Sequence, residues 1–167
     1  MQIETDLKKI KAFSEKYDEQ NWKFRLYLKN SDISDRKLDN IVHEIYEKVS
    51  SQINCRDCAN CCKVLHPIIR KKDVSRLTKL LNISNDEFID KYLKKDENGT
   101  FVFKGEICPF LVNNSCTVYE NRPEDCHSFP HLHKSKFRSR LMGIVINSSL
   151  CPIIFNVYQK LKLTLRD

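Results

Sequence analysis

The chain has 167 residues, of which 41% are hydrophobic and 31% charged, and its formal net charge is +7. With three glycines and five prolines, this composition excludes a largely disordered chain and argues against a turn-rich β-sandwich. No apolar run approaches the ~20 residues of a membrane span, and the first residues lack the apolar core of a signal peptide. We therefore expect a cytoplasmic protein without a membrane partner.

The first third of the chain is expected to be mostly helical. Apolar residues at three- and four-residue spacing predict an amphipathic helix over residues 4–20. Residues 22–28 alternate between apolar and basic side chains, which favours a short half-buried strand, although Phe24 and Leu28 would also share a helical face. The clearest helical stripe runs over residues 34–50 and leads directly to the first cysteine.

Two further helices are predicted in the middle of the chain. Asp73 can cap a helix that continues through Leu81. Ser84 stands three residues before Glu87, which is the spacing of a capping box, and predicts a second helix that reaches about Lys95. An Asn-Gly turn and a short apolar segment follow this helix.

The last part of the chain carries weaker signals. A β-hairpin across Asn113-Asn114 would bring Cys108 and Cys116 together. Residues 141–146 are apolar and compatible with a strand, and Pro152 is placed to open a final helix. The elements together predict one small, helix-rich α+β domain with an irregular, metal-stapled cysteine core. We expect residues 1–50 to form a helical segment packed on that core, and residues 51–167 to form the metal-binding domain.

The cysteines are the most informative residues of the sequence. Four thiols fall within eight residues, and four more are spread over the rest of the chain: Cys55, Cys58, Cys61, Cys62, Cys108, Cys116, Cys126 and Cys151. In a reducing compartment such clusters bind metal more often than they form disulfides, and thiolates two residues apart can converge on one ion. All eight are therefore candidate metal ligands, and we expect them to lie in one neighbourhood.

The spacing of the first three cysteines indicates two kinds of metal centre. Cys55, Cys58 and Cys61 repeat as in ferredoxin-type clusters, which take a distant Cys-Pro as the fourth ligand. Two such pairs are present, beginning at Cys108 and Cys151. Zinc is the other candidate, because four thiolates are a common structural zinc site. Spacing alone does not distinguish an iron–sulfur cluster from zinc.

Cys62 directly follows Cys61 and is expected to point away from the same ion, as a structural residue or as a ligand of a second site. Three explanations other than metal binding are weaker. Chance burial does not explain such tight clustering, and a disulfide framework needs an oxidising compartment. A thioredoxin-like pair needs a βαβ context that the sequence does not show.

Several charged residues near the cysteines have two possible roles. Arg122 could neutralise an anionic thiolate centre, or it could simply cap a turn or pair with Glu120. Histidine binds zinc well, but eight thiols already exceed the needs of one site. We therefore expect three nearby histidines to be exposed or to lie behind the ligands: His127, His131 and His133.

Residues 134–140 form a basic segment around Phe137. Such a run is most often a solvated face, and the alternative is a contact to nucleic-acid phosphates with Phe137 stacked on a base. The net charge adds little support, because thiolates bound to metal would offset part of it. Isolated glycines also cannot form a phosphate-binding loop. We expect a metal partner rather than a nucleic acid.

The order of the cysteine motifs is specific. A Cys-x2-Cys-x2-Cys-Cys run is followed by Cys-Pro-Phe-Leu at 108–111, by Cys-Thr-Val-Tyr-Glu-Asn-Arg-Pro-Glu-Asp-Cys at 116–126, by Phe-Pro at 129–130 and by Cys-Pro at 151–152. Over roughly residues 50–160 this order resembles the YkgJ-like family, which is described as a zinc- or iron-chelating, eight-cysteine domain and whose members are often labelled Fe–S oxidoreductases. The resemblance implies a metal site.

One position departs from that family. A glycine is common after the second cysteine, where this chain has Ala59. If the loop requires a left-handed residue, Asn60 is the better local candidate, because asparagine tolerates that conformation more readily than alanine.

The sequence thus predicts a metal-binding protein that holds an iron–sulfur cluster or zinc through clustered thiolates, for electron transfer or metal handling. The alternative is a zinc-stabilised interaction module whose basic loop binds a protein or nucleic-acid partner. A reversible redox couple distinguishes the two, because zinc has none. The sequence identifies neither a substrate nor a reaction.

Overall fold

The computed structural model describes residues 2–165 and is helix-rich, with about 60% of the chain helical and a few short strands. This agrees with the predicted α+β class. The chain forms two compact units. Unit 1 comprises Met1–Asn54 and Pro130–Asp167, and unit 2 comprises Cys55–Phe129. Residues 130–167, which the sequence groups with the cysteine segment, belong to the same unit as the N-terminal helices.

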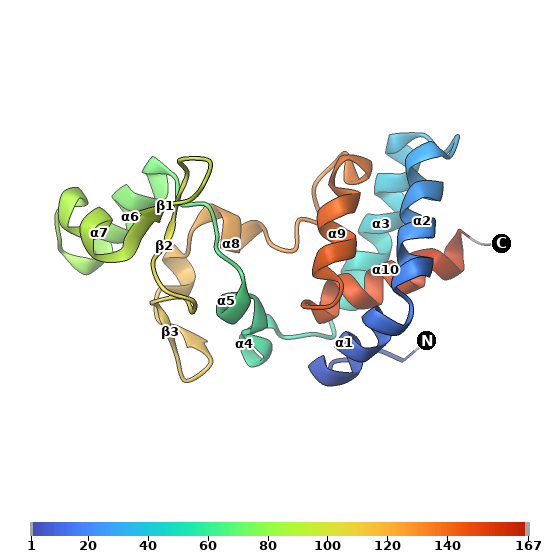
Figure 1. Ribbon diagram of the computed structural model, residues 1–167, viewed down its shortest axis with the longest axis horizontal. Helices are drawn as coiled ribbons and strands as arrows, with labels where there is room; N and C mark the ends of the chain where they lie inside the picture. The colour runs from blue at the N-terminus through green and yellow to red at the C-terminus, as the bar shows by residue number, and fades with distance from the viewer. Residues whose placement is uncertain (1, 166–167) are drawn as a thin grey trace. The chain divides into compact units, whose positions relative to one another are not determined.

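Unit 1 is a helical bundle built around the C-terminal helix (Figure 1). Its main helices and one 3-10 turn are α1 (Leu7–Lys16), α2 (Asp18–Asn30), α3 (Asp35–Ser50), η2 (Phe137–Arg140), α9 (Leu141–Asn147) and α10 (Pro152–Thr164). Helix α10 contacts α1, α3 and α9, and most of its residues are buried. A helix that is apolar on most sides has to be surrounded by others, and α10 is therefore the centre of the unit.

The helices predicted at residues 34–50 and from Pro152 onward are confirmed. Ser34 caps α3, with its hydroxyl accepting from the Lys37 amide at 3.3 Å. Pro152 occupies the first turn of α10, where its missing amide hydrogen has no helical partner to lose. The predicted helix over residues 4–20 is present as α1, and the chain then continues into α2 after a break at Tyr17.

Two predicted strands are wrong, because both segments are helical. Residues 22–28 lie in α2, where Phe24 and Leu28 are buried on one face. The alternation of apolar and basic residues there also satisfies a four-residue spacing, and packing selected the helix. Residues 141–146 form most of α9, which buries Leu141, Ile144 and Val145 at helical spacing.

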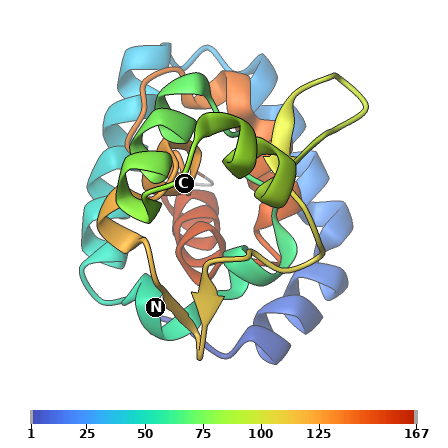
Figure 2. The same cartoon turned by 90° about the vertical axis from the view of Figure 1, so that its left-hand side faces the viewer.

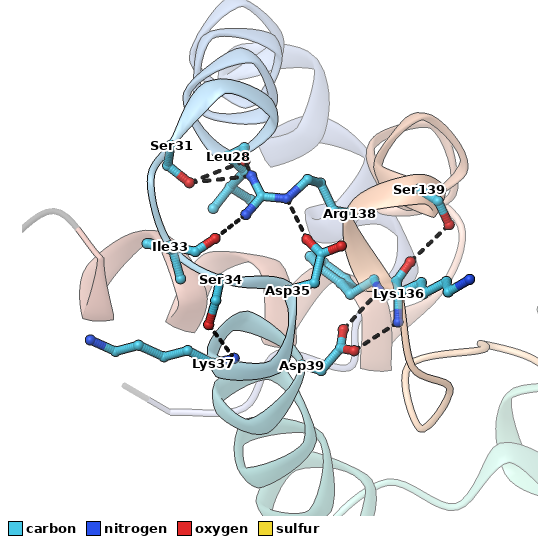
Figure 3. A network of polar contacts seen from close by, with 11 residues as sticks. Leu28, Ser31, Ile33, Ser34, Asp35, Lys37, Asp39, Lys136, Arg138 and Ser139 are labelled. Atoms are coloured by element: carbon cyan, nitrogen blue, oxygen red, sulfur yellow. Dashed lines mark hydrogen bonds and ion pairs between the residues drawn. The ribbon is translucent and has the colours of Figure 1, made fainter.

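The basic segment 134–140 is part of the architecture of unit 1 (Figure 3). Asp39 accepts hydrogen bonds from the backbone amides of Lys136 and Phe137 at 2.7 and 2.8 Å. Arg138 pairs with Asp35 at 2.7 Å and donates to backbone carbonyls at the end of α2 and in the loop that follows. Phe137 is only 1% exposed. This aromatic ring is therefore not available to stack on a nucleic-acid base, and binding of a partner by the basic loop stays a prediction.

Unit 2 combines two longer helices, three helices of four or five residues, one 3-10 turn at Tyr119–Asn121 and two small antiparallel hairpins. The elements that form its apolar part are α6 (Lys71–Leu81), α7 (Asn85–Tyr92), β1 (Leu93–Lys95) and β2 (Phe101–Phe103). Eight buried side chains make its core: Ile69, Val74, Leu77, Phe88, Leu93, Phe103, Phe110 and Val118. Cys108 and Cys116 pack against this cluster, so the thiol region begins where the apolar core ends.

Both helices predicted in unit 2 are present. The start of α7 is as predicted, and α6 begins two residues before Asp73. Ser84 caps α7 as expected, accepting from the Glu87 amide at 3.1 Å. Helix α6 begins at Lys71, and Asp73 lies in its first turn, where the carboxylate accepts from the Arg70 amide at 2.9 Å. Helix α7 ends before Lys95 because residues 93–95 pair with residues 101–103 in an antiparallel hairpin.

Within the described residues 2–165, no single helix is long and apolar enough to cross a membrane. Residues 137–147 and 152–164 reach the required length and apolarity only as a pair, and that pair is bent by 117°.

Candidate metal centre

The first four cysteines lie on two very short helices separated by a left-handed residue. Helix α4 is Cys55–Cys58 and helix α5 is Asn60–Val64. Ala59, between them, has φ 50° and ψ 11° and is buried. The left-handed residue is therefore Ala59. The sequence favoured Asn60 for this conformation, and that prediction is wrong. The left-handed backbone conformation lies at the position where a glycine is common in the YkgJ-like family. In this chain the Cβ atom of Ala59 makes that conformation sterically unfavourable.

The hairpin predicted across Asn113-Asn114 is present and connects two cysteines. Strand β3 (Leu111–Val112) pairs with β4 (Ser115–Cys116), and both asparagines have positive φ, as a tight two-residue hairpin requires. The Cys108 amide donates to the Cys62 carbonyl at 3.0 Å. This bond ties the start of the hairpin segment to α5, far away in the sequence. In Figures 1 and 2 the tip of the β3–β4 hairpin extends away from α6 and α7.

Cys126 is placed by helix α8 (Glu124–Ser128), which is anchored by a buried carboxylate. Asp73 is 1% exposed, and it accepts from the Glu124 amide at 3.0 Å and from the Arg76 guanidinium at 2.8 Å. The Arg76 guanidinium also donates to the Arg122 carbonyl at 2.8 Å. Helix α6 thus fixes the backbone immediately before Cys126.

Four thiols from three separate segments share one neighbourhood: Cys62, Cys108, Cys116 and Cys126. Every one of the six pairs among them interacts through thiolate charge, which raises the pKa of at least one partner. Burial is the larger cause, and it raises the pKa of Cys108 to about 11 and that of Cys126 to about 12. We call these four residues the thiol quartet. At Cys108, Cys116 and Cys126 a neutral thiol is therefore favoured until a cation is added.

Cys62 also interacts with the cysteines of the first motif. Its pKa is lowered to about 7, chiefly by a hydrogen bond from Cys61 and further by the positive charges of Arg122 and Lys63. The pKa of Cys55 is raised by burial first, and then by the charges of Cys58 and Cys62. The thiol quartet and the triplet predicted from spacing therefore meet at Cys62.

The donor set fits zinc or iron in its chemistry, because both metals bind thiolate sulfur. Its side chains are not yet arranged around a point. Among the described residues, no three or more His, Cys, Asp or Glu side chains form a group that could hold an ion as they lie. Four sulfurs on one zinc are about 3.8 Å apart, given ~2.3 Å bonds in a tetrahedron, whereas charges interact over longer distances. Binding would require the sulfurs to move together.

The remaining candidates lie outside the quartet. Cys151 belongs to unit 1, where it is 7% exposed and directly precedes α10, and its place in a shared centre remains a prediction. His127 and His133 are exposed, in agreement with the expectation for these side chains, and His131 is half-buried.

Sequence reasoning treated Arg122 as either structural or electrostatic, and the structure shows both. Its guanidinium donates to the Tyr119 carbonyl at 2.7 Å, and its charge lowers the pKa of Cys55, Cys62 and Cys116. Arg56 and Tyr119 were missed as possible functional residues. Their positions in the sequence could have indicated them, because Arg56 lies between Cys55 and Cys58 and Tyr119 lies between Cys116 and Cys126.

Comparison with known proteins agrees with this distribution of cysteines. No curated protein and no solved structure matches the chain significantly. A family model named CxxCxxCC, with the description "Putative zinc- or iron-chelating domain", matches residues 54–143. The match covers more than half of the chain and includes every cysteine except Cys151. The YkgJ-like resemblance fits the same domain. The chain belongs to the CxxCxxCC family of zinc- or iron-chelating domains.

Proposed function

We propose that unit 2 holds zinc or an iron centre through cysteine thiolates, and that the thiol quartet forms one complete ligand set. The observation that carries the proposal is the mutual interaction of all four quartet thiols, which come from α5, from the β3–β4 hairpin segment and from α8. Two of the four, Cys108 and Cys116, pack against the apolar core, and all four are free thiols.

The protein's own residues would contribute ligation, burial and position. The thiols of Cys108 and Cys126 have raised pKa values because burial penalises the thiolate form. A bound cation supplies the positive charge that makes the thiolate favourable, so metal uptake should release protons. The hydrogen bond between Cys108 and Cys62, and the anchoring of α8 by Asp73, hold the segments that present the thiols.

The triplet Cys55, Cys58 and Cys61 would act as a second group of ligands. It either binds a second ion or supplies sulfurs to a larger cluster that also involves the quartet. The ferredoxin-like spacing supports a cluster, and the completeness of the quartet supports separate four-thiolate sites. Cys151, in unit 1, stays a metal ligand predicted from the sequence alone.

The use that we propose is electron transfer or metal handling, in a reducing compartment that keeps the thiols free. Metal identity separates these uses, because an iron–sulfur cluster has a reduction potential and zinc has none. The test is purification under anaerobic conditions, followed by metal and acid-labile sulfide analysis, absorption spectroscopy and voltammetry. We expect at least one zinc or iron per chain. Protein that contains neither, and that takes up neither after reduction and reconstitution, would overturn the proposal.

The number of centres follows from paired variants. Cys126→Ser removes a quartet thiol, and Cys58→Ser removes a triplet thiol. With two separate sites, each variant loses one metal equivalent and keeps the other. With one shared cluster, either change abolishes the whole spectrum.

A further inference from the structure

Two arginine side chains of unit 2 are stacked against one tyrosine ring. The guanidinium carbon of Arg122 lies 3.9 Å from the centre of the Tyr119 ring, and that of Arg56 lies 4.7 Å from it. The aromatic face attracts each cation, but the two positive charges repel each other. An arrangement that concentrates like charge in this way is stabilised when negative charge is brought close to it.

The thiolates of the proposed centre are one source of negative charge close to the two arginines. Arg56 lies on α4 between two cysteines of the first motif, and α4 contacts β4, which contains Cys116. The charge of Arg122 acts on the thiols of Cys55, Cys62 and Cys116, and the charge of Arg56 acts on Cys116. Both guanidinium groups thus lie close enough to cysteines of the proposed centre for their charge to act on the thiols.

The backbone around Arg122 is held by a different residue. Arg76 donates to the carbonyls of Asn121 and Arg122 at 3.2 and 2.8 Å, and Asp73 fixes Arg76 and the start of α8. The Arg122 side chain makes one hydrogen bond of its own to this loop, to the Tyr119 carbonyl at 2.7 Å. The charge of Arg122 can therefore be removed while the principal clamp on the loop is kept.

We propose that Arg56 and Arg122, stacked against Tyr119, determine the affinity of the thiolate metal centre by compensating its negative charge. The inference rests on the proposed function of unit 2. A divalent ion bound by four thiolates carries a net charge of −2, and two guanidinium groups match it.

The test is competition between the protein and a chelator for Zn²⁺, measured for the full chain. Arg122→Gln and Arg56→Gln should each weaken zinc binding about 10-fold, which is the lower end of the loss seen for residues behind metal ligands. Arg122→Lys keeps the charge and loses the planar fork, so it should recover most of the affinity. The deficit of Arg122→Gln should shrink as salt is raised, because added ions screen the missing charge.

Lys95 offers a matched control in the same unit. Its ammonium group lies 5.8 Å from the centre of the Phe101 ring, and the principal charges acting on the cysteines do not include it. Lys95→Gln also removes a cation from an aromatic face, but it should leave zinc affinity unchanged.

The outcomes separate the two proposals. Wild-type protein that binds no zinc and no iron overturns the proposed function and this inference with it. Tight wild-type binding with unchanged affinity in both glutamine variants overturns the inference alone, and so does an Arg122→Lys variant as weak as Arg122→Gln. If thermal unfolding shows that Arg122→Gln does not fold, the Arg56→Gln variant decides, because Arg56 is exposed. Its zinc affinity is then measured at several salt concentrations, and an affinity equal to that of the wild type overturns the inference.

Discussion

Unit 1 and unit 2 reach order by different means. In unit 1 the buried helix α10 contacts α1, α3 and α9, and the core side chains lie on long helices with clear apolar faces. In unit 2 the apolar core is built mainly by α6, α7 and the β1–β2 hairpin, whereas five of the seven cysteines lie on helices of four or five residues. The other two, Cys108 and Cys116, belong to the β3–β4 hairpin segment. Helices this short are not stable by themselves. We therefore propose that the thiol half of unit 2 depends on a bound metal for its order.

The two units also share one structural feature. Each contains a buried aspartate that accepts backbone amides from a segment far along the chain. Asp39 holds Lys136 and Phe137 in unit 1, and Asp73 holds Glu124 in unit 2. In unit 1 the segment so held completes a helical bundle. In unit 2 it carries Cys126, so the same type of contact serves a candidate site.

Metal removal should produce the largest difference between the units. Structural zinc contributes on the order of 10 kcal/mol to the folding of small thiolate domains, so complete chelation should lower the melting temperature of unit 2 by ~10 °C or more. Hydrogen exchange followed by residue should show lost protection over residues 52–66 and 108–128, with α3 and α10 little changed. Identical exchange before and after metal removal would contradict the dependence of unit 2 on its ligand.

Replacement of single cysteines should sharpen the comparison within unit 2. Serine at Cys116 or Cys126 removes a quartet sulfur, and we expect zinc affinity to fall on the order of 100-fold. Serine at Cys55, Cys58 or Cys61 tests the triplet in the same assay. His127→Ala is the control, because this side chain is exposed and should cost no metal. Equal losses in the histidine and cysteine variants would show that the ligand assignment is wrong.

The two buried aspartates should separate stability from metal binding. Asp73→Ala and Asp39→Ala each remove two or more hydrogen bonds to a buried carboxylate, and each should destabilise its unit by about 3 kcal/mol. Only Asp73→Ala should also weaken metal binding, because Asp73 anchors the helix that carries Cys126. Denaturant unfolding and zinc competition on both variants measure the two effects. A similar loss of zinc affinity in Asp39→Ala would remove the distinction.

The smallest expected effect is a gain. Ala59 has φ 50°, where alanine costs roughly 1–2 kcal/mol and glycine costs nothing sterically. After the greater freedom of glycine in the unfolded chain is subtracted, Ala59→Gly should stabilise unit 2 by about 0.5–1 kcal/mol. The same substitution at Ala12, on the exposed face of α1, should destabilise unit 1 by about 1 kcal/mol. Thermal unfolding that shows the same sign for both would refute the left-handed conformation of Ala59.

The sequence was sufficient where local chemistry decides the structure. The apolar stripe and serine cap predicted α3, Pro152 predicted α10, and two asparagines predicted the β3–β4 hairpin. It was insufficient where one pattern satisfies two structures. The alternation in residues 22–28 also has helical spacing, and only the burial of Phe24 and Leu28 against the rest of unit 1 decides between them.

The sequence identified the cysteines of the candidate site but not which of them lie close together. The count and clustering of cysteines indicated a thiolate centre, and the family match agrees. The quartet could not be read from spacing, because Cys62 meets Cys108 through a backbone hydrogen bond between distant segments, and Asp73 places Cys126 across a similar separation. Ala59 was misread for a related reason. Intrinsic preference favours asparagine in the left-handed region, but the hydrogen bonds of α4 and α5 place the break one residue earlier.

The discontinuity of unit 1 has a consequence for biosynthesis. Unit 2 is continuous from Cys55 to Phe129, whereas unit 1 needs residues 130–167 to receive its central helix. A ribosome therefore synthesises all seven cysteines of unit 2 before it makes α10, and these thiols leave the exit tunnel ahead of that helix. Since domains tend to fold as they emerge, the thiol region is exposed to the metal and oxidant levels around the ribosome while its host bundle is still unfinished. A nascent chain that ends at residue 140 and is tethered through a flexible linker long enough to clear the exit tunnel should accordingly take up zinc, although its α3 does not yet resist protease.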